Sequence, residues 1–263
     1  MKRMFIFGLG YSATFIARAL EATGWEVVST GRVGTLSFDD AGSVHMALAD
    51  ADHVLSSVPP SGDGEDPVLA RYGQAIAGKW LGYLSSTGVY GDTGGAWVDE
   101  TAPTGTGRRT ARAEADAAWL AMGARVFRLP GIYGPAIAGH GARSALDRVR
   151  EGKAHRIDLP NQVFSRVHVA DIAAGVLAAL DAEPGAYNLA DDLPCSQNAV
   201  IEHACRLLGL PLPPLQSLDE AGLSPMARAF YAENRRVANG KARRILRWTP
   251  HFPSYRSGLQ SLL

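Results

Sequence analysis

The sequence predicts a doubly wound α/β fold, in which helices cover both faces of a largely parallel sheet. Short apolar runs alternate with amphipathic segments along the first half of the chain, which is typical of repeated strand–helix units. A glycine turn, Gly8-Leu9-Gly10, follows the first apolar run and precedes the first helical segment. The 263 residues are enough for one large domain, or for one domain with a small appendage.

The first strand–helix–strand unit has the clearest pattern. Residues 4–7 form a short apolar run, as expected of a strand buried on both faces. After the glycine turn, Ile16 and Leu20 belong to a helical repeat that ends at Gly24. Residues 25–30 read as a second strand, so we expect a right-handed β-α-β crossover.

The alternation continues to about Gly131. The expected strands cover residues 34–38, 52–58, 79–86 and 124–129, and the expected helices cover residues 39–50, 67–77 and 108–122. Pro67 suits the first turn of its helix. Beyond Gly131 we expect helices over residues 144–151, 171–180 and 196–209, with Asp171 as the N-cap of the second, and a seventh strand over residues 185–191.

Composition narrows the possible partners and surroundings. Lys plus Arg and Asp plus Glu each total 26, which gives no reason to expect a nucleic acid or an anionic membrane as partner. Cys195 and Cys205 fit no metal-binding spacing, and we expect no metal site. No apolar run reaches the ~18 residues of a membrane span. These features favour a cytoplasmic protein with reduced thiols.

The segment from Gly8 to Ala13 has the pattern G-x-G-x-x-A. In such a turn the first glycine allows the tight bend, the second lets the backbone approach a pyrophosphate, and the small third residue lets helix and strand pack closely. Backbone N–H groups at the helix start, near Tyr11 and Ser12, then face the anion. The pattern favours dinucleotide binding; a purely structural turn is the alternative.

The end of the second expected strand distinguishes NADP from NAD. A dinucleotide with free ribose hydroxyls usually meets an Asp or Glu there. This chain has no acidic residue from Ser29 to Gly34, and Arg32 offers a fork of donors that suits a 2′-phosphate. We therefore expect NADP to be preferred over NAD, with a solvated loop cation as the alternative role for Arg32.

Six segments together resemble the extended short-chain dehydrogenase/reductase family, also called the NAD-dependent epimerase/dehydratase family. They are "GLGYSA", "SSTGVYGD", "VDETAP", "FRLPGIYGP", "RVHVADIAAGVLAAL" and "YNLADD", in the family's order and along nearly the whole chain. The resemblance implies one Rossmann-type domain with about seven strands. Its NADP-binding part would lie mainly in residues 1–135, and a smaller substrate-binding part mainly in residues 136–170 and 190–263.

The resemblance also implies further contacts with the cofactor. Asp39 would lie near the adenine, and Ser57, Pro59 and Pro130 would line the cofactor cleft. Members of the family are commonly homodimers, so a homodimer is possible here.

The family's reaction uses a Ser or Thr together with a Tyr and a Lys spaced Y-x-x-x-K on one helix. Ser86 matches the hydroxyl member. The helix that should supply the pair contains neither Tyr nor Lys, and Arg108 and Arg112 take the matching places. An arginine stays protonated and is a poor proton donor, although Arg112 can still hold a ribose or a phosphate.

Tyr90 and Tyr133 are candidate substitutes for the missing tyrosine, and His140 and His168 are conceivable acids. Each of these residues also has a structural interpretation, as a packed aromatic or a satisfied histidine. Without a clear proton donor, two functions stay open. The first is an NADP(H)-dependent oxidoreductase or epimerase-like protein, acting on a small hydroxyl, carbonyl or nucleotide-sugar-like substrate. The second is a non-catalytic NADP(H)-binding sensor or interaction protein. A structural protein with an empty cleft is a third, less favoured interpretation.

Overall fold

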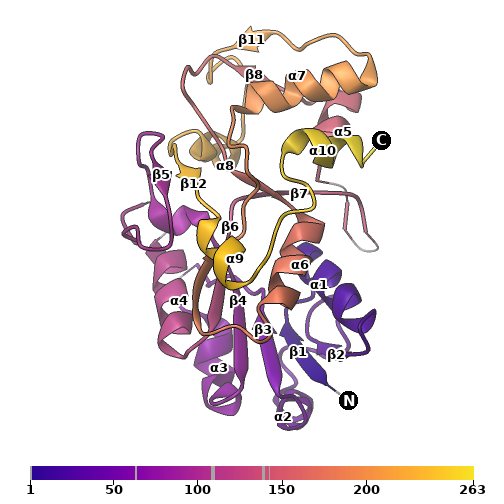
Figure 1. The fold of residues 1–263 in the computed structure, drawn as a ribbon, viewed down its shortest axis with the longest axis vertical. Helices are drawn as coiled ribbons and strands as arrows, with labels where there is room; N and C mark the ends of the chain where they lie inside the picture. The colour runs from indigo at the N-terminus through magenta and orange to yellow at the C-terminus, as the bar shows by residue number, and fades with distance from the viewer. Residues whose placement is uncertain (1, 63, 108–109, 138–139, 142) are drawn as a thin grey trace.

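The computed structural model describes residues 2–62, 64–107, 110–137, 140–141 and 143–263. Its centre is a parallel sheet whose strands follow the order β10-β6-β4-β3-β1-β2 (Figure 1). These strands are β1 (Arg3–Phe7), β2 (Glu26–Ser29), β3 (His53–Ser56), β4 (Trp80–Ser86), β6 (Arg125–Leu129) and β10 (Gly185–Asn188). The predicted doubly wound α/β fold is confirmed.

Helices cover both faces of this sheet. Helices α1 (Tyr11–Glu21) and α6 (Val169–Ala178) pack together on one face, and α2 (Ala41–Ala49), α3 (Pro67–Ile76) and α4 (Thr110–Ala121) cover the other (Figure 1). Met4 and Ile6 of β1 belong to the core on the first face, and Phe5 and Phe7 to the core on the second. Side chains alternate between the faces of a strand, so a strand buried on both sides is apolar throughout.

The sheet has six strands among the described residues instead of the expected seven, because residues 34–38 do not form a strand. Only Leu36 makes an isolated bridge, to Thr30. The segment folds back on the end of β2, where Thr35 Oγ1 contacts both the N–H and the carbonyl oxygen of Ser29 at 3.1 Å. A Cβ atom on Gly34 would lie 2.6 Å from the carbonyl carbon of Thr30, so the glycine permits this tight return.

Helix α6 also differs from the prediction, because it begins two residues before Asp171. His168 is the N-cap, and its Nδ1 accepts a hydrogen bond from the N–H of Ala170 at 3.3 Å. The carboxylate of Asp171 instead accepts from the backbone N–H groups of His251 (2.6 Å) and Phe252 (3.1 Å). The predicted cap therefore fastens the C-terminal segment to the start of α6.

Much of the chain after β6 gathers beyond the carboxyl end of the sheet (Figure 1). This region contains α5 (Ala145–Arg150), α7 (Gln197–Leu208), α8 (Pro225–Phe230) and α10 (Tyr255–Gln260), and the strand pairs β7 (Gly131–Tyr133) with β9 (Arg166–His168) and β8 (Arg156–Ile157) with β11 (Leu215–Gln216). Helix α7 ends at Gly209 as predicted, with a left-handed φ of 65°. The remaining elements are η1 (Thr87–Tyr90), β5 (Trp97–Val98), β12 (Arg236–Val237) and α9 (Gly240–Ile245). No helix in the described part of the chain is both long enough and apolar enough to span a bilayer.

Candidate cofactor-binding site

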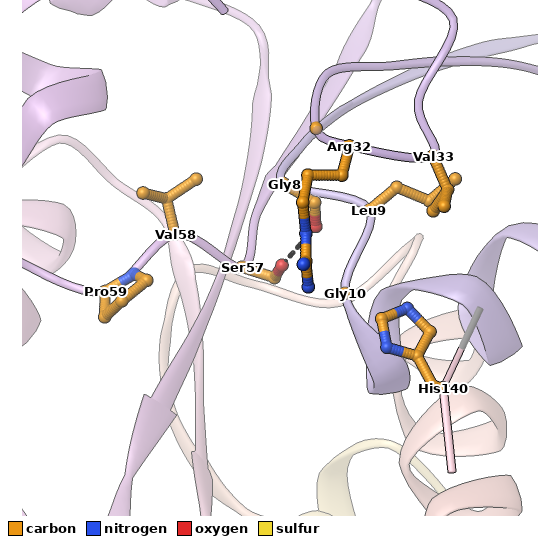
Figure 2. Close-up of a pocket in the computed structure, with 10 residues that line it drawn as sticks. Gly8, Leu9, Gly10, Arg32, Val33, Ser57, Val58, Pro59 and His140 are labelled. Atoms are coloured by element: carbon orange, nitrogen blue, oxygen red, sulfur yellow. Dashed lines mark hydrogen bonds between the residues drawn. The ribbon is translucent and has the colours of Figure 1, made fainter. Parts of the chain in front are cut away.

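A cavity of about 410 Å³ opens where β1, β2 and β3 end. In parallel sheets this edge, at the point where connections leave a strand in opposite directions, is the usual place for a ligand. Here the chain passes from β1 to β2 on one side and continues to β3 on the other. The lining residues are Gly8, Leu9, Gly10, Gly31, Arg32, Val33, Ser57, Val58, Pro59 and His140 (Figure 2).

The turn after β1 is fastened to both neighbouring strands. The N–H of Gly8 donates to Thr30 Oγ1 at 3.1 Å, and the N–H of Leu9 donates to the Thr30 carbonyl at 2.7 Å. On the other side, Ser57 Oγ donates to the carbonyl oxygen of Gly8 (Figure 2). Gly8 has a φ of 80°, and a Cβ atom there would lie 2.9 Å from Val58 Cγ2. Glycine is therefore required by both conformation and space.

The amino end of α1 is open toward the cavity. Gly10 is the N-cap and supplies no side-chain cap, and the first turn of α1 contains no acidic residue. The first N–H groups of a helix have no partner within the helix, and the helix dipole favours an anion beside them. A Cβ atom on Gly10 would meet no atom within 4 Å, so the N-cap residue borders open space. A pyrophosphate fits this arrangement.

Arg32 brings the positive charge to the same cavity. Its exposed side chain extends across the cavity in front of Gly8 (Figure 2). Within the described ranges, no carboxylate lies within ion-pair distance of Arg32. The planar guanidinium is thus available for a phosphate group.

Some of the other residues predicted to bind a cofactor line the cavity, and the rest do not. Ser57 and Pro59 line it. Tyr11 is buried, and its hydroxyl donates to the Pro135 carbonyl at 2.8 Å. The Asp39 carboxylate forms an exposed ion pair with Arg71 at 2.8 Å. Ser12, in the first turn of α1, and Pro130, directly after β6, do not line the cavity.

Ser86, at the end of β4, is half-buried and is not a lining residue of the cavity. Its Oγ accepts a hydrogen bond from the N–H of Gly88 at 3.1 Å and caps η1. No residue in the described part of the chain accepts the hydroxyl proton of Ser86, so this proton can be donated to a ligand. Arg112 donates through Nη1 to the hydroxyl of Tyr83 at 3.0 Å. Arg108, the other replacement in the expected Tyr-Lys pair, lies outside the described residues.

The hydroxyl of Tyr90 belongs to a buried network of polar side chains. It donates to Asn188 Oδ1 at 2.8 Å and accepts from Arg128 Nη1 at 3.0 Å. Arg128 also forms a buried ion pair with Asp116 (2.7 Å), which in turn accepts from Ser85 Oγ at 2.6 Å. Burial, partly opposed by the charge of Arg128, raises the pKa of Tyr90 to about 12. Both hydrogen-bonding directions of this phenol are therefore occupied.

Tyr133 and His168 are buried, as Tyr90 is, and make contacts within the fold. The Tyr133 hydroxyl is 3.4 Å from the Ser254 carbonyl oxygen, and burial raises the pKa of this tyrosine. His168 caps α6, and burial lowers the pKa of its imidazole to about 4. His168 is therefore neutral near pH 7 and is a poor acid there.

Sequence reasoning missed several of the lining residues. Leu9 lies between two glycines that were identified, and Val33 and Gly31 flank Arg32. His140 was considered only as an acid, yet its ring lies beside Gly10 (Figure 2). No local pattern in the sequence places this histidine at the amino end of α1. Among the described residues, no group of three or more His, Cys, Asp or Glu side chains is arranged to hold a metal ion.

Proteins from Escherichia coli and Streptomyces have sequences similar to that of this chain. No protein-family model matches the chain. Protein YeeZ of Escherichia coli K12 is 26% identical over 258 residues, covering 84% of this chain and 89% of YeeZ. A 3-diazoavenalumate denitrifying reductase from Streptomyces is 31% identical over 140 residues, covering 51% of this chain and 45% of the reductase.

Solved structures give longer matches. A functionally unknown conserved protein from Silicibacter pomeroyi DSS is 40% identical, with a TM-score of 0.86, over 100% of this chain and 98% of its own. The human epimerase family protein SDR39U1, solved with NADPH, is 16% identical, with a TM-score of 0.76, over 98% of both chains. Further neighbours are a dehydratase and an epimerase of sugar nucleotides, both solved with NAD. The chain thus belongs to one family with the Silicibacter pomeroyi protein, and its structural neighbours are proteins of the NAD-dependent epimerase/dehydratase family, as its sequence motifs predicted.

Proposed function

We propose that this protein binds NADP(H) in the cavity at the ends of β1, β2 and β3. One observation carries the proposal: Arg32, which has no ion pair with any described residue, faces the same cavity as the amino end of α1, which has no side-chain cap. Arg32 would hold the 2′-phosphate, and the N–H groups at the start of α1 would hold the pyrophosphate. The presence of NADPH in the structure of human SDR39U1 supports this choice of cofactor.

We further propose that the protein is an oxidoreductase acting on a small carbonyl or hydroxyl compound, with nucleotide-sugar-like substrates included. The name of the Streptomyces relative, a reductase, is in keeping with this class. Bound NADP(H) would supply or accept the hydride. Ser86 would donate its free hydroxyl proton in a hydrogen bond to the substrate oxygen, because its Oγ is already oriented by the N–H of Gly88.

The proton that the reaction requires would come from water. The Tyr90 hydroxyl is held by Asn188 and Arg128, so it has no free proton to give. The guanidinium of Arg112 donates a hydrogen bond to Tyr83. Arg112 would hold a ribose or a phosphate of the cofactor through its positive charge, and would not transfer a proton. An active site with one positioned hydroxyl and a water molecule predicts slow turnover compared with a site that has a dedicated acid.

A carbonyl-reduction assay tests the oxidoreductase. Purified protein is mixed with NADPH and a panel of aldehydes, ketones and 4-keto sugar nucleotides, and the loss of NADPH absorbance is followed. Ser86→Ala should reduce turnover at least about tenfold, the effect of removing one hydrogen bond that strengthens in the transition state. Ser257→Ala, at an exposed position of α10, is the matched control and should leave turnover unchanged. Equal turnover in the wild type and Ser86→Ala would contradict the role of Ser86.

A non-catalytic NADP(H)-binding protein is the second candidate. The hydrogen bonds that Tyr90 and Arg112 make within the protein favour this candidate, because neither side chain is free to transfer a proton. Under this alternative, NADPH binds and protects the protein against unfolding, but no carbonyl compound in the panel oxidises the bound NADPH. Substrate-dependent oxidation of NADPH by the wild type would exclude the alternative.

A further inference from the structure

Backbone hydrogen bonds link two pairs of residues between β7 and α5. Gly134 and Arg143 exchange backbone hydrogen bonds of 3.0 and 3.1 Å, and Ile137 and His140 exchange a second pair of 3.0 and 2.8 Å. The position of His140 is thus set by backbone pairing on the same loop.

Contacts with Tyr11 fasten this loop to the first turn of α1. The Tyr11 hydroxyl donates to the Pro135 carbonyl at 2.8 Å, and the guanidinium carbon of Arg143 lies 4.7 Å from the centre of the Tyr11 ring. The ring of His140 meets the Tyr11 ring edge-on, with the centroids 6.3 Å apart. A Cβ atom on Gly134 would lie 2.8 Å from the Tyr11 hydroxyl, so only glycine allows the loop to come this close.

These contacts place the His140 imidazole in the lining of the cofactor cavity. The ring lies beside the Gly10 turn, at the amino end of α1 (Figure 2). Its Nε2 atom is buried and has no hydrogen-bond partner among the described residues. Buried nitrogen atoms are nearly always hydrogen-bonded, and an unpaired one costs free energy. Because this atom has almost no accessible surface, a small rotation of the ring would bring it to a partner in the cavity, and the resulting hydrogen bond would remove that cost.

We propose that His140 is a cofactor-binding residue that donates a hydrogen bond to a pyrophosphate oxygen of the dinucleotide. This role rests on the proposed binding of NADP(H). Arg32 and His140 would then recognise different phosphates: Arg32 the 2′-phosphate at the end of β2, and His140 the pyrophosphate at the start of α1. The histidine would contribute equally to NADPH and NADH, and Arg32 to NADPH alone.

Three nucleotides separate the two contributions. NADPH, NADH and adenosine 2′-monophosphate, which lacks the pyrophosphate, are titrated into the wild type, His140→Ala and His140→Gln. His140→Ala should weaken NADPH and NADH binding by a similar factor of about ten, the loss expected for one hydrogen bond to a charged group. Its affinity for adenosine 2′-monophosphate should stay at the wild-type value. His140→Gln retains an N–H donor and should recover part of the loss.

Two controls make the result specific. His45→Ala, on the exposed side of α2, removes a histidine that does not line the cavity and should bind all three nucleotides as the wild type does. Arg32→Ala should weaken NADPH and adenosine 2′-monophosphate and leave NADH unchanged.

Two outcomes would overturn the role of His140 while NADP(H) binding stands. In the first, His140→Ala binds NADPH as tightly as the wild type. In the second, it loses affinity for adenosine 2′-monophosphate by the same factor, which would mean that the whole cavity has changed. If the wild type binds neither NADPH nor NADH, the proposed function fails as well.

Discussion

Asp191 is a buried carboxyl group whose ionisation should set part of the pH dependence of stability. It follows β10, its side chain is 2% exposed, and its Oδ1 accepts from the N–H of Leu193 at 3.2 Å. The Oδ2 atom is buried and has no hydrogen-bond partner in the described part of the chain. Burial, partly opposed by Arg166, raises the pKa of Asp191 from 3.8 to about 7.

The raised pKa means that the folded protein holds this proton more tightly than the unfolded chain does. The resulting stabilisation is complete below the unfolded pKa of 3.8 and is lost as the pH rises through about 7. Between about pH 5 and about pH 8, the free energy of unfolding should fall by roughly 3 kcal/mol from this group alone. Asp191→Asn keeps an oxygen for the Leu193 N–H and removes the titration.

Urea unfolding followed by circular dichroism at these two pH values measures the effect. Relative to the wild type, Asp191→Asn should gain roughly 3 kcal/mol of unfolding free energy between the lower and the higher pH. Asp158→Asn, at an exposed carboxylate, is the control and should follow the wild type at both pH values. The same difference between Asp191→Asn and the wild type at both pH values would refute the claim that Asp191 titrates near neutrality.

Two further predictions concern the cofactor and the buried network. Arg32→Ala should raise the dissociation constant of NADPH about tenfold or more, because a charge-assisted contact with the 2′-phosphate is lost, and should leave that of NADH unchanged; equal losses for both would argue against this role. Asp116→Asn should lower the unfolding free energy by about 3 kcal/mol, because it leaves the 4%-exposed side chain of Arg128 without its carboxylate; a loss within the error of a urea titration would show that the network tolerates the change.

Local patterns were sufficient to predict the parts of the fold that follow chain order. The apolar run of β1, the glycine turn and the helical repeat of α1 are all contained in about twenty residues, and the structure has them in place. The segment over residues 34–38 has the same apolar character as a short strand. Its actual conformation depends on the close return of Gly34 to Thr30, which hydrophobic spacing does not encode.

Some residues of the candidate site could likewise be predicted from local patterns, and others could not. Gly8 and Ser57 directly follow β1 and β3, and Arg32 comes shortly after β2; a parallel sheet brings such positions to one edge. The carboxylate of Asp39, which was expected near the adenine, is paired with Arg71, which is 32 residues later in the chain. The approach of His140 depends on the Tyr11–Pro135 hydrogen bond, which spans 124 residues. Such contacts are set by tertiary packing, so a motif in one segment cannot reveal them.

The central claim is that the cavity at the ends of β1, β2 and β3 binds NADP(H) in preference to NAD(H). Titrating the wild-type protein with NADPH and NADH, and following energy transfer from its five tryptophans to the nicotinamide, tests it most directly. We predict saturable binding of both cofactors, with NADPH the tighter ligand by about tenfold or more. Tighter binding of NADH, or no binding of either cofactor, would contradict the claim.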